Sequence, residues 1–207
     1  MVYAAEQDGA RATAARLGAR LGVEPVNGGV HPRFGTRNVI LPLADERYVE
    51  VVGVLGHPAS DKAPFGQVVR ARSEAGGGWL GWVIEVKDMS AHEERLGRKA
   101  VSGNRHRPDG VELRWQQLGV RGLQADPQLP FFVMWDADSP HPSKLVSESV
   151  VLSTLTIAGD PQRVREWIGL QDGEKVSPSI GLTSVAPHGP PGLLSVSFNT
   201  PTGQVTI

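Results

Sequence analysis

The polar residues best suited to chemistry stand close together early in the chain, between residues 31 and 38. His31 can take part in proton transfer near neutral pH, or it can be a simple turn residue before a proline. Asn38 can bind a ligand, or it can tie a loop backbone with its amide. Arg33 and Arg37 add two cations that can neutralise a carboxylate or receive an anionic ligand.

Glu50 interrupts an otherwise apolar stretch, residues 48–54, with an acidic side chain. Successive side chains of a β-strand point to opposite faces. If Val49 and Val51 face a helix, Glu50 therefore faces the other side of the sheet, which in a curled sheet is the cleft. A carboxylate there can be a metal ligand, a general base or the buried partner of an arginine, and these alternatives stay open.

Several common catalytic motifs are excluded. Residues 76–81 have the spacing G-x-G-x-x-G, but a strand rather than the required helix is predicted after the glycines. Residues 92–96 begin like a zinc-protease helix, yet Leu96 stands where the second histidine belongs. The chain has no cysteine, no G-x-S-x-G turn and no phosphate-binding loop, which removes thiol nucleophiles and the commonest hydrolases and NTPases.

The charge balance bears on the partners. The 21 basic and 22 acidic residues give a net charge of −1, so no global field attracts a polyanion and nucleic acid is not expected as a partner. No apolar run is long enough to cross a bilayer, and the N-terminus does not resemble a secretion signal. We therefore expect a cytoplasmic protein with no membrane partner.

The elements that must position these residues follow one another in three similar rounds. Each round has a strand, a helix and further strands, as judged from apolar periodicity and from turn and capping residues. The strands are predicted at residues 1–5, 38–43, 48–54, 79–86, 111–118, 130–135, 149–157, 180–185, 193–199 and 204–207. Helices are predicted from residue 8 to 22, from 88 to 96 and from 160 to 168. This succession favours an α+β fold with helices on one side of curved sheets.

Two sets of motifs resemble the glyoxalase-like domain family of the vicinal oxygen chelate superfamily. The first set comprises residues 29–38 and 48–51, and the second comprises Trp82 with residues 107–110, 113–115 and 130–136. The likeness covers roughly residues 1–140. Each motif is weak alone, and their specificity comes from the set.

The resemblance implies paired β-α-β-β-β modules that form curled antiparallel sheets around a cleft, with the site between the modules. The first module then spans residues 1–54, residues 55–78 form a connector, and the second module spans residues 79–140. Residues 141–207 are expected to form a C-terminal β-α-β-β extension. This extension carries no readable motif, and it can extend the sheet or form the contact of a homodimer.

The resemblance also bears on metal binding. Many members of the family bind a divalent metal through a His in the first strand and a Glu in the last strand of a module, and Glu50 occupies that Glu position. The usual Asp-His pair before the first strand is missing here, either truly or because the chain start was placed late, since the chain opens at Met1. In the second module, residues 82–84 offer no His either. A divalent metal is therefore possible but not favoured, no metal ligand is assigned, and the cofactor stays unknown.

The functional hypothesis that follows is a lyase or isomerase acting on a small oxygenated or anionic metabolite. The alternative is a non-catalytic protein that sequesters a small molecule, as resistance-type members of the superfamily do. We assign the catalytic roles to Glu50 and His31. Tryptophans are more often core than pocket wall, but one of them is expected to line the cleft. The predicted ligand-binding residues are Arg33, Arg37, Asn38, Trp82, Arg114, Trp115 and Trp135.

Overall fold

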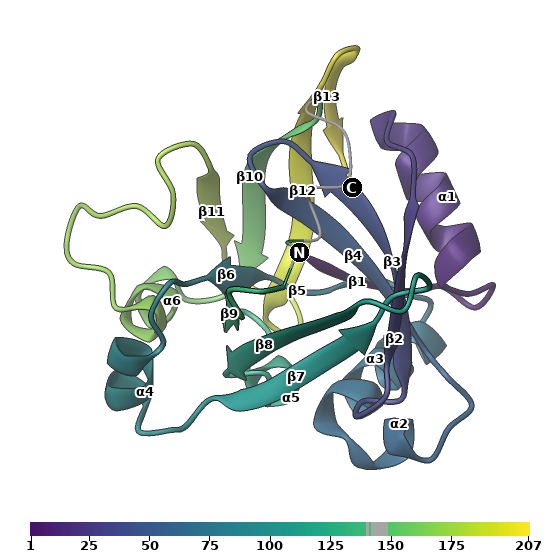
Figure 1. Cartoon of the computed structure of the whole chain (residues 1–207). Helices are drawn as coiled ribbons and strands as arrows, with labels where there is room; N and C mark the ends of the chain where they lie inside the picture. The colour runs from purple at the N-terminus through teal and green to yellow at the C-terminus, as the bar shows by residue number, and fades with distance from the viewer. Residues whose placement is uncertain (140, 142–148) are drawn as a thin grey trace.

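The computed structural model describes residues 1–139, 141 and 149–207, and it contains two sheets (Figure 1). The larger sheet has nine strands in the order β5-β1-β4-β3-β2-β7-β8-β9-β6. The smaller has four in the order β11-β10-β12-β13. Because the large sheet repeats one motif twice, its two halves can be compared strand by strand.

The first module, formed by the N-terminal strands, has its first strand beside its last. Its elements are β1 (Val2–Ala4), α1 (Ala10–Leu21), β2 (Val26–His31), β3 (Thr36–Leu43) and β4 (Arg47–Val54). β1 runs parallel to β4, whereas β4 with β3 and β3 with β2 are antiparallel. This arrangement is a β-α-β-β-β unit.

The second module repeats that arrangement. Its elements are β6 (Val83–Glu85), α4 (Ser90–Leu96), β7 (Val101–His106), β8 (Glu112–Leu118) and β9 (Phe131–Trp135), with the short helix α5 (Gly122–Ala125) inserted before β9. β6 runs parallel to β9, and β7, β8 and β9 are antiparallel neighbours. The modules join where β2 pairs with β7, at Val30 and His106. The α+β class with paired modules is therefore confirmed.

The predicted strand at residues 79–86 is split in two. Its first part, β5 (Gly78–Gly81), pairs with β1, whereas β6 pairs with β9. These are the two edge strands of the nine-stranded sheet, and only Trp82 separates them along the chain. The edges of the sheet therefore lie close together, and the sheet curls almost into a barrel.

Helix α1 covers the outer face of the first module. Its apolar residues recur at helical spacing, and Ala14, Leu17 and Leu21 are buried together with Val49 and Val51 of β4. The helix ends at Gly22, whose positive φ of 71° provides the left-handed C-cap. One side of β4 is thus committed to the helix, which leaves its other side for the interior of the curled sheet.

The predicted connector at residues 55–78 contains two helices, α2 (Ala59–Lys62) and α3 (Pro64–Glu74). The prolines and glycines of this segment obscured α3, although Pro64 lies at the first helical turn, where proline is favoured. Phe65 and Val69, one turn apart, are buried in a cluster with Val52 of the concave face. The helix therefore fills part of the interior of the sheet.

The C-terminal unit forms the smaller sheet. Its elements are β10 (Val151–Ala158), α6 (Pro161–Ile168), β11 (Gly181–Val185), β12 (Gly192–Thr200) and β13 (Gly203–Thr206). The side chain of Asp160 caps α6 by accepting a hydrogen bond from the amide of Gln162, and Pro161 follows in the first turn. β10 runs parallel to β11 and antiparallel to β12. All four strands predicted between residues 149 and 207 are present, so the unit is β-α-β-β-β rather than the expected β-α-β-β, and its strand order differs from that of the two modules.

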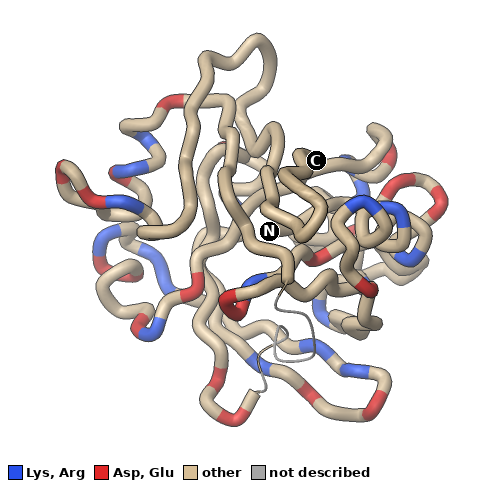
Figure 2. Tube along the Cα trace, turned by 90° about the horizontal axis from the view of Figure 1, so that it is seen from above, with Lys and Arg blue, Asp and Glu red and all other residues tan. Residues whose placement is uncertain are grey.

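Charges of both signs alternate along the chain, and Figure 2 shows them interspersed over loops and helices rather than gathered in one basic region. Within the described ranges, no helix combines the length and the apolar character that crossing a membrane requires. The mixed distribution of charge does not point to a polyanionic partner.

Candidate functional site

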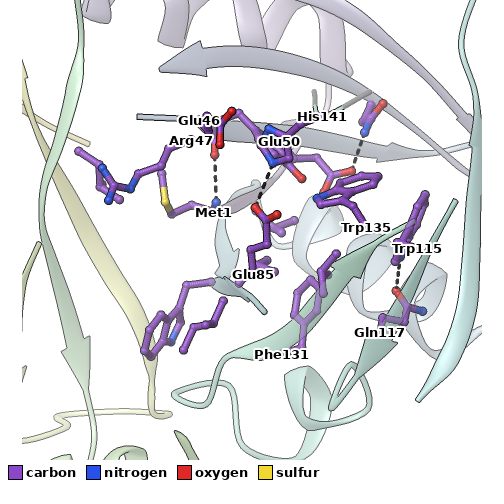
Figure 3. A pocket seen from close by; sticks show the side chains of 18 of the residues that line it. Met1, Glu46, Arg47, Glu50, Glu85, Trp115, Gln117, Phe131, Trp135 and His141 are labelled. Atoms are coloured by element: carbon purple, nitrogen blue, oxygen red, sulfur yellow. Dashed lines mark hydrogen bonds and ion pairs between the residues drawn. The ribbon is translucent and has the colours of Figure 1, made fainter. Parts of the chain in front are cut away.

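A cavity of about 410 Å³ lies on the concave side of the nine-stranded sheet. Residues of both modules line it, such as Glu50 and Trp115 (Figure 3). The C-terminal unit contributes Leu152, Leu155 and Ile180. Its walls are mainly apolar, with a small number of charged and amide groups between them. This combination is typical of small-molecule sites, in which apolar walls hold the ligand body and a few polar groups fix its orientation.

Strand β4 presents Glu50 to this cavity. Tyr48 and Glu50 line the cavity, whereas Val49 and Val51 are packed in the core cluster that includes α1. The alternation expected for a strand therefore separates the two sets. Burial raises the pKa of the Tyr48 hydroxyl, with the nearby Glu50 carboxylate adding to the effect, so Tyr48 is a neutral phenol at neutral pH.

Glu50 is held by the amide of Asn38. The side chain of Glu50 is 15% exposed, and its Oε1 accepts a hydrogen bond of 2.6 Å from Asn38 Nδ2. The same carboxylate oxygen lies 3.6 Å from His31 Nε2. Within the part of the chain that the structure describes, no hydrogen bond engages Glu50 Oε2. One oxygen is therefore fixed, and the other is available to a ligand.

His31 is buried and neutral. Its Nδ1 lies 2.9 Å from Thr36 Oγ1, and its Nε2 lies 3.4 Å from Asn38 Nδ2. Burial lowers the pKa of His31 to about 4, although Glu50 acts in the opposite direction and Arg105 adds to the lowering. A proton on Nδ1 lets His31 donate to Thr36 and accept from Asn38, which satisfies both ring nitrogens. His31 therefore helps to orient Asn38 toward Glu50.

A β-bulge makes room for the Asn38 side chain. The β2–β3 register shifts between Asn27 and Gly29, and a Cβ at Gly28 would collide with Asn38 Oδ1. Asn38 Oδ1 is itself buried, and it has no hydrogen-bond partner among the described residues. An unsatisfied buried acceptor beside a cavity is costly and is suited to receive a donor from a ligand.

The three predicted tryptophans all line the cavity. Trp82 donates its Nε1 hydrogen bond to the Gln128 carbonyl at 2.9 Å, and Trp115 donates to Gln117 Oε1 at 3.0 Å. The rings of Trp115 and Trp135 lie 5.3 Å apart between centroids, on neighbouring strands (Figure 3). Trp115 lies over Gly103 of β7, where a Cβ would collide with its ring. The second module therefore supplies an aromatic wall.

The three arginines predicted to bind ligand lie elsewhere. Arg37 is exposed beside Asn38, because alternation along β3 turns it to the outer face. Arg33 donates to the Ser102 carbonyl at 2.8 Å, and Arg114 donates to the Glu112 carboxylate. None of the three lines the cavity. The structural alternative for Glu50, a buried pair with one of them, therefore lacks its partner, and their role in binding stays an unsupported prediction.

Arg105 is a cavity residue that was not selected from the sequence. It lies in the basic run 105–107, which by composition is typical of a solvated turn or of a loop that steers an anion, yet it is 3% exposed and lines the cavity from β7. The turn begins later, at residues 107–110, and β7 includes Arg105. The sequence of β7 has no apolar alternation that would mark Arg105 as inward-facing.

At one side of the cavity, His141 Nε2 lies 3.2 Å from Glu85 Oε2 (Figure 3). The His141 ring also contacts the rings of Tyr48 and Trp135, at 5.7 and 5.8 Å between centroids. The α-amine of Met1 borders the same cavity and donates to the Tyr48 carbonyl at 3.1 Å. Burial lowers the pKa of that amine to about 6, so at neutral pH it is mainly uncharged.

The residues around Glu50 do not fit the metal centre that the fold family implies. Over residues 1–139, 141 and 149–207, no group of three His, Asp or Glu side chains is placed to share one ion. Glu50 Oε1 is already an acceptor for an amide N–H, and the cation Arg105 shares the cavity. Both features disfavour a divalent cation. The absence of a tightly bound metal stays a prediction.

A curled sheet of two β-α-β-β-β modules around a cavity, with Glu50 on the last strand of the first module, defines a protein of the vicinal oxygen chelate class. The model of the glyoxalase-like domain matches residues 1–170, and the chain belongs to this family. A crystal structure of a hypothetical protein from Staphylococcus aureus shares the fold, with a TM-score of 0.61 and 14% identity over 99% of this chain and 82% of the other. A search of curated proteins found no significant match.

Proposed function

We propose that the protein binds a small oxygenated or anionic organic molecule in the central cavity and acts on it as a lyase or isomerase, with Glu50 as the base. The observation that carries this proposal is the state of the Glu50 carboxylate. Its Oε1 is fixed by Asn38 at 2.6 Å, and its Oε2 has no hydrogen-bond partner among the described residues. A positioned carboxylate with one free oxygen in a partly dry site can accept a proton from a bound substrate.

The chemistry requires a carbon acid. Glu50 Oε2 takes the proton from a carbon next to a carbonyl, and the electron pair of the broken C–H bond moves onto the carbonyl oxygen. In an isomerase acting on an α-hydroxy carbonyl compound, the hydroxyl proton passes to the enolate oxygen, and the proton held by Glu50 goes to the former carbonyl carbon. In a lyase, the electron pair returns from the enolate oxygen, a C=C bond forms between the α and β carbons, and the bond from the β carbon to a leaving group breaks. The leaving group then takes the proton from Glu50. His31 holds Asn38 and thereby the carboxylate, so its own predicted catalytic role becomes one of positioning.

The second candidate is a binding protein that sequesters its ligand without changing it. The favouring observation is the apolar surface of strand β9, which presents Phe131, Val133 and Trp135 to the cavity. Such a surface holds an apolar body without reacting with it. A cytoplasmic location and a homodimer remain predictions for either function.

One experiment separates the two functions. Purified protein is incubated with a metabolite extract, and the small molecules are compared by mass spectrometry before and after, both free and bound. Catalysis predicts a substrate that disappears in amounts far above the protein concentration, and Glu50→Gln should slow this loss by about 10²-fold or more. Sequestration predicts unchanged compound bound in amounts no greater than the protein.

The matched control is Glu112→Gln, because Glu112 lies on the second module outside the cavity lining and pairs with Arg114. This variant should behave as the wild type does. Equal turnover by wild type and Glu50→Gln would contradict the role of Glu50 as the base.

A further inference from the structure

Arg105 lies inside the molecule because of its place on β7. Gly103 and Arg105 are buried, whereas Ser102 and His106 are exposed, as alternation along the strand requires. The stem of Arg105 passes close to Gly29 of β2, where a Cβ would come within 3.2 Å of the arginine Cγ. Gly29 has a φ of 134°, so neither the backbone nor the space accepts a larger residue there. A Cβ at this position would collide first with the His106 carbonyl, so the close approach of β2 and β7 at the junction of the two modules depends on Gly29.

The charge of Arg105 has no counter-ion within contact distance. In the described ranges no carboxylate lies within 4.0 Å of its guanidinium, and its buried Nε has no hydrogen-bond partner. The arginine two residues further on differs, since Arg107 forms an ion pair of 2.7 Å with Asp109. Burial lowers the pKa of Arg105, but a guanidinium keeps its charge in proteins. Burying an unpaired cation costs free energy, which indicates that a bound anion pairs with the Arg105 guanidinium.

The groups around Arg105 limit the charge of the anion that can bind. The Glu50 carboxylate shares the cavity and repels a bound anion. This repulsion is greater for a doubly charged anion than for a singly charged one. The cavity lining also includes the acidic residues Asp45, Glu46 and Glu85, and its other guanidinium is that of Arg47. Acidic groups therefore outnumber basic ones, which suits a singly charged group better than a phosphate dianion. A carboxylate matches the two parallel donors of the guanidinium fork.

The rest of the cavity limits the size, shape and polarity of the ligand body. Trp115, Trp135 and Phe131 form an apolar, aromatic wall from the second module. The cavity of about 410 Å³ lies within the range of small-molecule sites. A flat, apolar body packs against such a wall by dispersion and by offset ring contacts.

We propose that the ligand is a monocarboxylic acid with an aromatic or similarly flat apolar body, and that Arg105 binds its carboxylate while the aromatic wall receives the body. This inference rests on the proposed function, since both use the same cavity, and it names the class of molecule.

Ligand binding tests the proposal without knowledge of the natural substrate. The probes are phenylacetate and indole-3-acetate, with phenylacetamide and indole-3-acetamide as their neutral counterparts and phenyl phosphate as the dianion. Calorimetry and thermal shift measure binding to the wild-type protein. The two acids should raise the melting temperature and bind at least about tenfold more tightly than their amides and than phenyl phosphate.

Two variants locate the carboxylate. Arg105→Gln should lose at least about tenfold in affinity for the acids and bind the amides unchanged. Arg107→Gln, which removes a paired arginine outside the cavity lining, should bind as the wild type does. Arg105→Met keeps the apolar stem without the charge, and it serves the same comparison if Arg105→Gln does not fold.

Contrary results would overturn either the role of Arg105 or the proposed class of ligand. Equal affinity for acids and amides, or full affinity in both Arg105 variants, overturns the role of Arg105. Tighter binding of phenyl phosphate, or no binding of either acid, overturns the ligand class. The extract experiment with Glu50→Gln uses no chosen probe, so the proposed function stands or fails separately.

Discussion

The two modules share one topology and present different chemistry to one cavity. The first turns a hydrogen-bonded polar cluster inward, made of His31, Asn38 and Glu50. The second turns an aromatic wall inward, with Trp115 and Trp135 on neighbouring strands. The strand order therefore determines which positions of a module point into the cavity. The residue type at each of these positions determines the chemistry that the module presents there.

The comparison also explains why Arg105 stands out. It comes from the second module, yet it lies at the β2–β7 junction and faces the polar cluster of the first. A repeat with two polar faces would hold a hydrated cavity, and one with two aromatic faces would close into a core. Because one module presents polar groups and the other aromatic groups, the cavity has a polar end and an apolar side.

The largest expected effect on stability comes from removing the aromatic wall. Trp115 is 8% exposed, and its ring contacts those of Trp135 and His31. Trp115→Ala should lower the free energy of unfolding by about 3–5 kcal/mol, since it empties buried volume that neighbours cannot refill. Urea denaturation measures the change, and a loss under about 1 kcal/mol would show that the wall is not part of the core. Arg114→Ala, on the adjacent outward position, is the control and should change little.

The next effect comes from crowding the polar cluster. Gly28→Ala places a methyl group against Asn38 Oδ1 in the bulge of β2. We expect a loss of about 1–3 kcal/mol, because Asn38 must move and weaken its hydrogen bond to Glu50. Gly56→Ala is the matched control, since a Cβ there has nothing within 4 Å. Equal melting curves for the two variants would mean that Asn38 adapts freely.

The polar cluster also predicts a dependence on pH. The pKa of buried His31 is about 4 against an ordinary 6.5, so its neutral form stabilises the folded state above about pH 6.5. This contribution is lost as the pH falls from 6.5 toward 4, because the unfolded chain takes up the proton first. At pH 5 the loss is about 2 kcal/mol.

His31→Gln removes this titration, so the variant should lose less stability than the wild type between pH 7 and pH 5. The charged groups that face His31, Glu50 and Arg105, are the same in both proteins. His106→Gln changes an exposed histidine and should follow the wild-type curve. Parallel curves for wild type and His31→Gln would contradict the buried, neutral state of His31.

A smaller effect is expected from the acid itself. Glu50→Gln keeps an acceptor oxygen for Asn38 and relieves a buried charge, but it also removes a negative charge near Arg105. These effects oppose each other, so the free energy of unfolding should change by less than about 1 kcal/mol. A loss of about 3–5 kcal/mol would instead identify Glu50 as half of a structural ion pair.

The smallest effect is expected from metal removal. Because Glu50 is engaged by an amide and faces a guanidinium, chelation with EDTA should leave the melting temperature unchanged. Elemental analysis of protein purified without added metal should find far less than one equivalent. One equivalent of Zn, Ni, Mn or Fe would show that side chains outside the polar cluster bind the ion.

Much of the fold followed from local patterns in the sequence. The spacing of Ala14, Leu17 and Leu21 predicted α1 and its buried face, and Gly22 predicted its end. The run around Val49 and Val51 predicted a strand whose alternate side chains separate, so the inward position of Glu50 was already implied. These features depend on neighbours along the chain, and the sequence determines them directly.

The tertiary structure alone decided which residues share the cavity. Arg37 and Asn38 are adjacent in sequence, yet only Asn38 reaches Glu50, because the β2–β3 bulge at Gly28 and the pairing of β3 with β4 set the inward face. Arg105 has the composition of a surface turn, but the β2–β7 junction buries it. Such placements depend on contacts between residues far apart in the chain, and no local pattern encodes the distance between them.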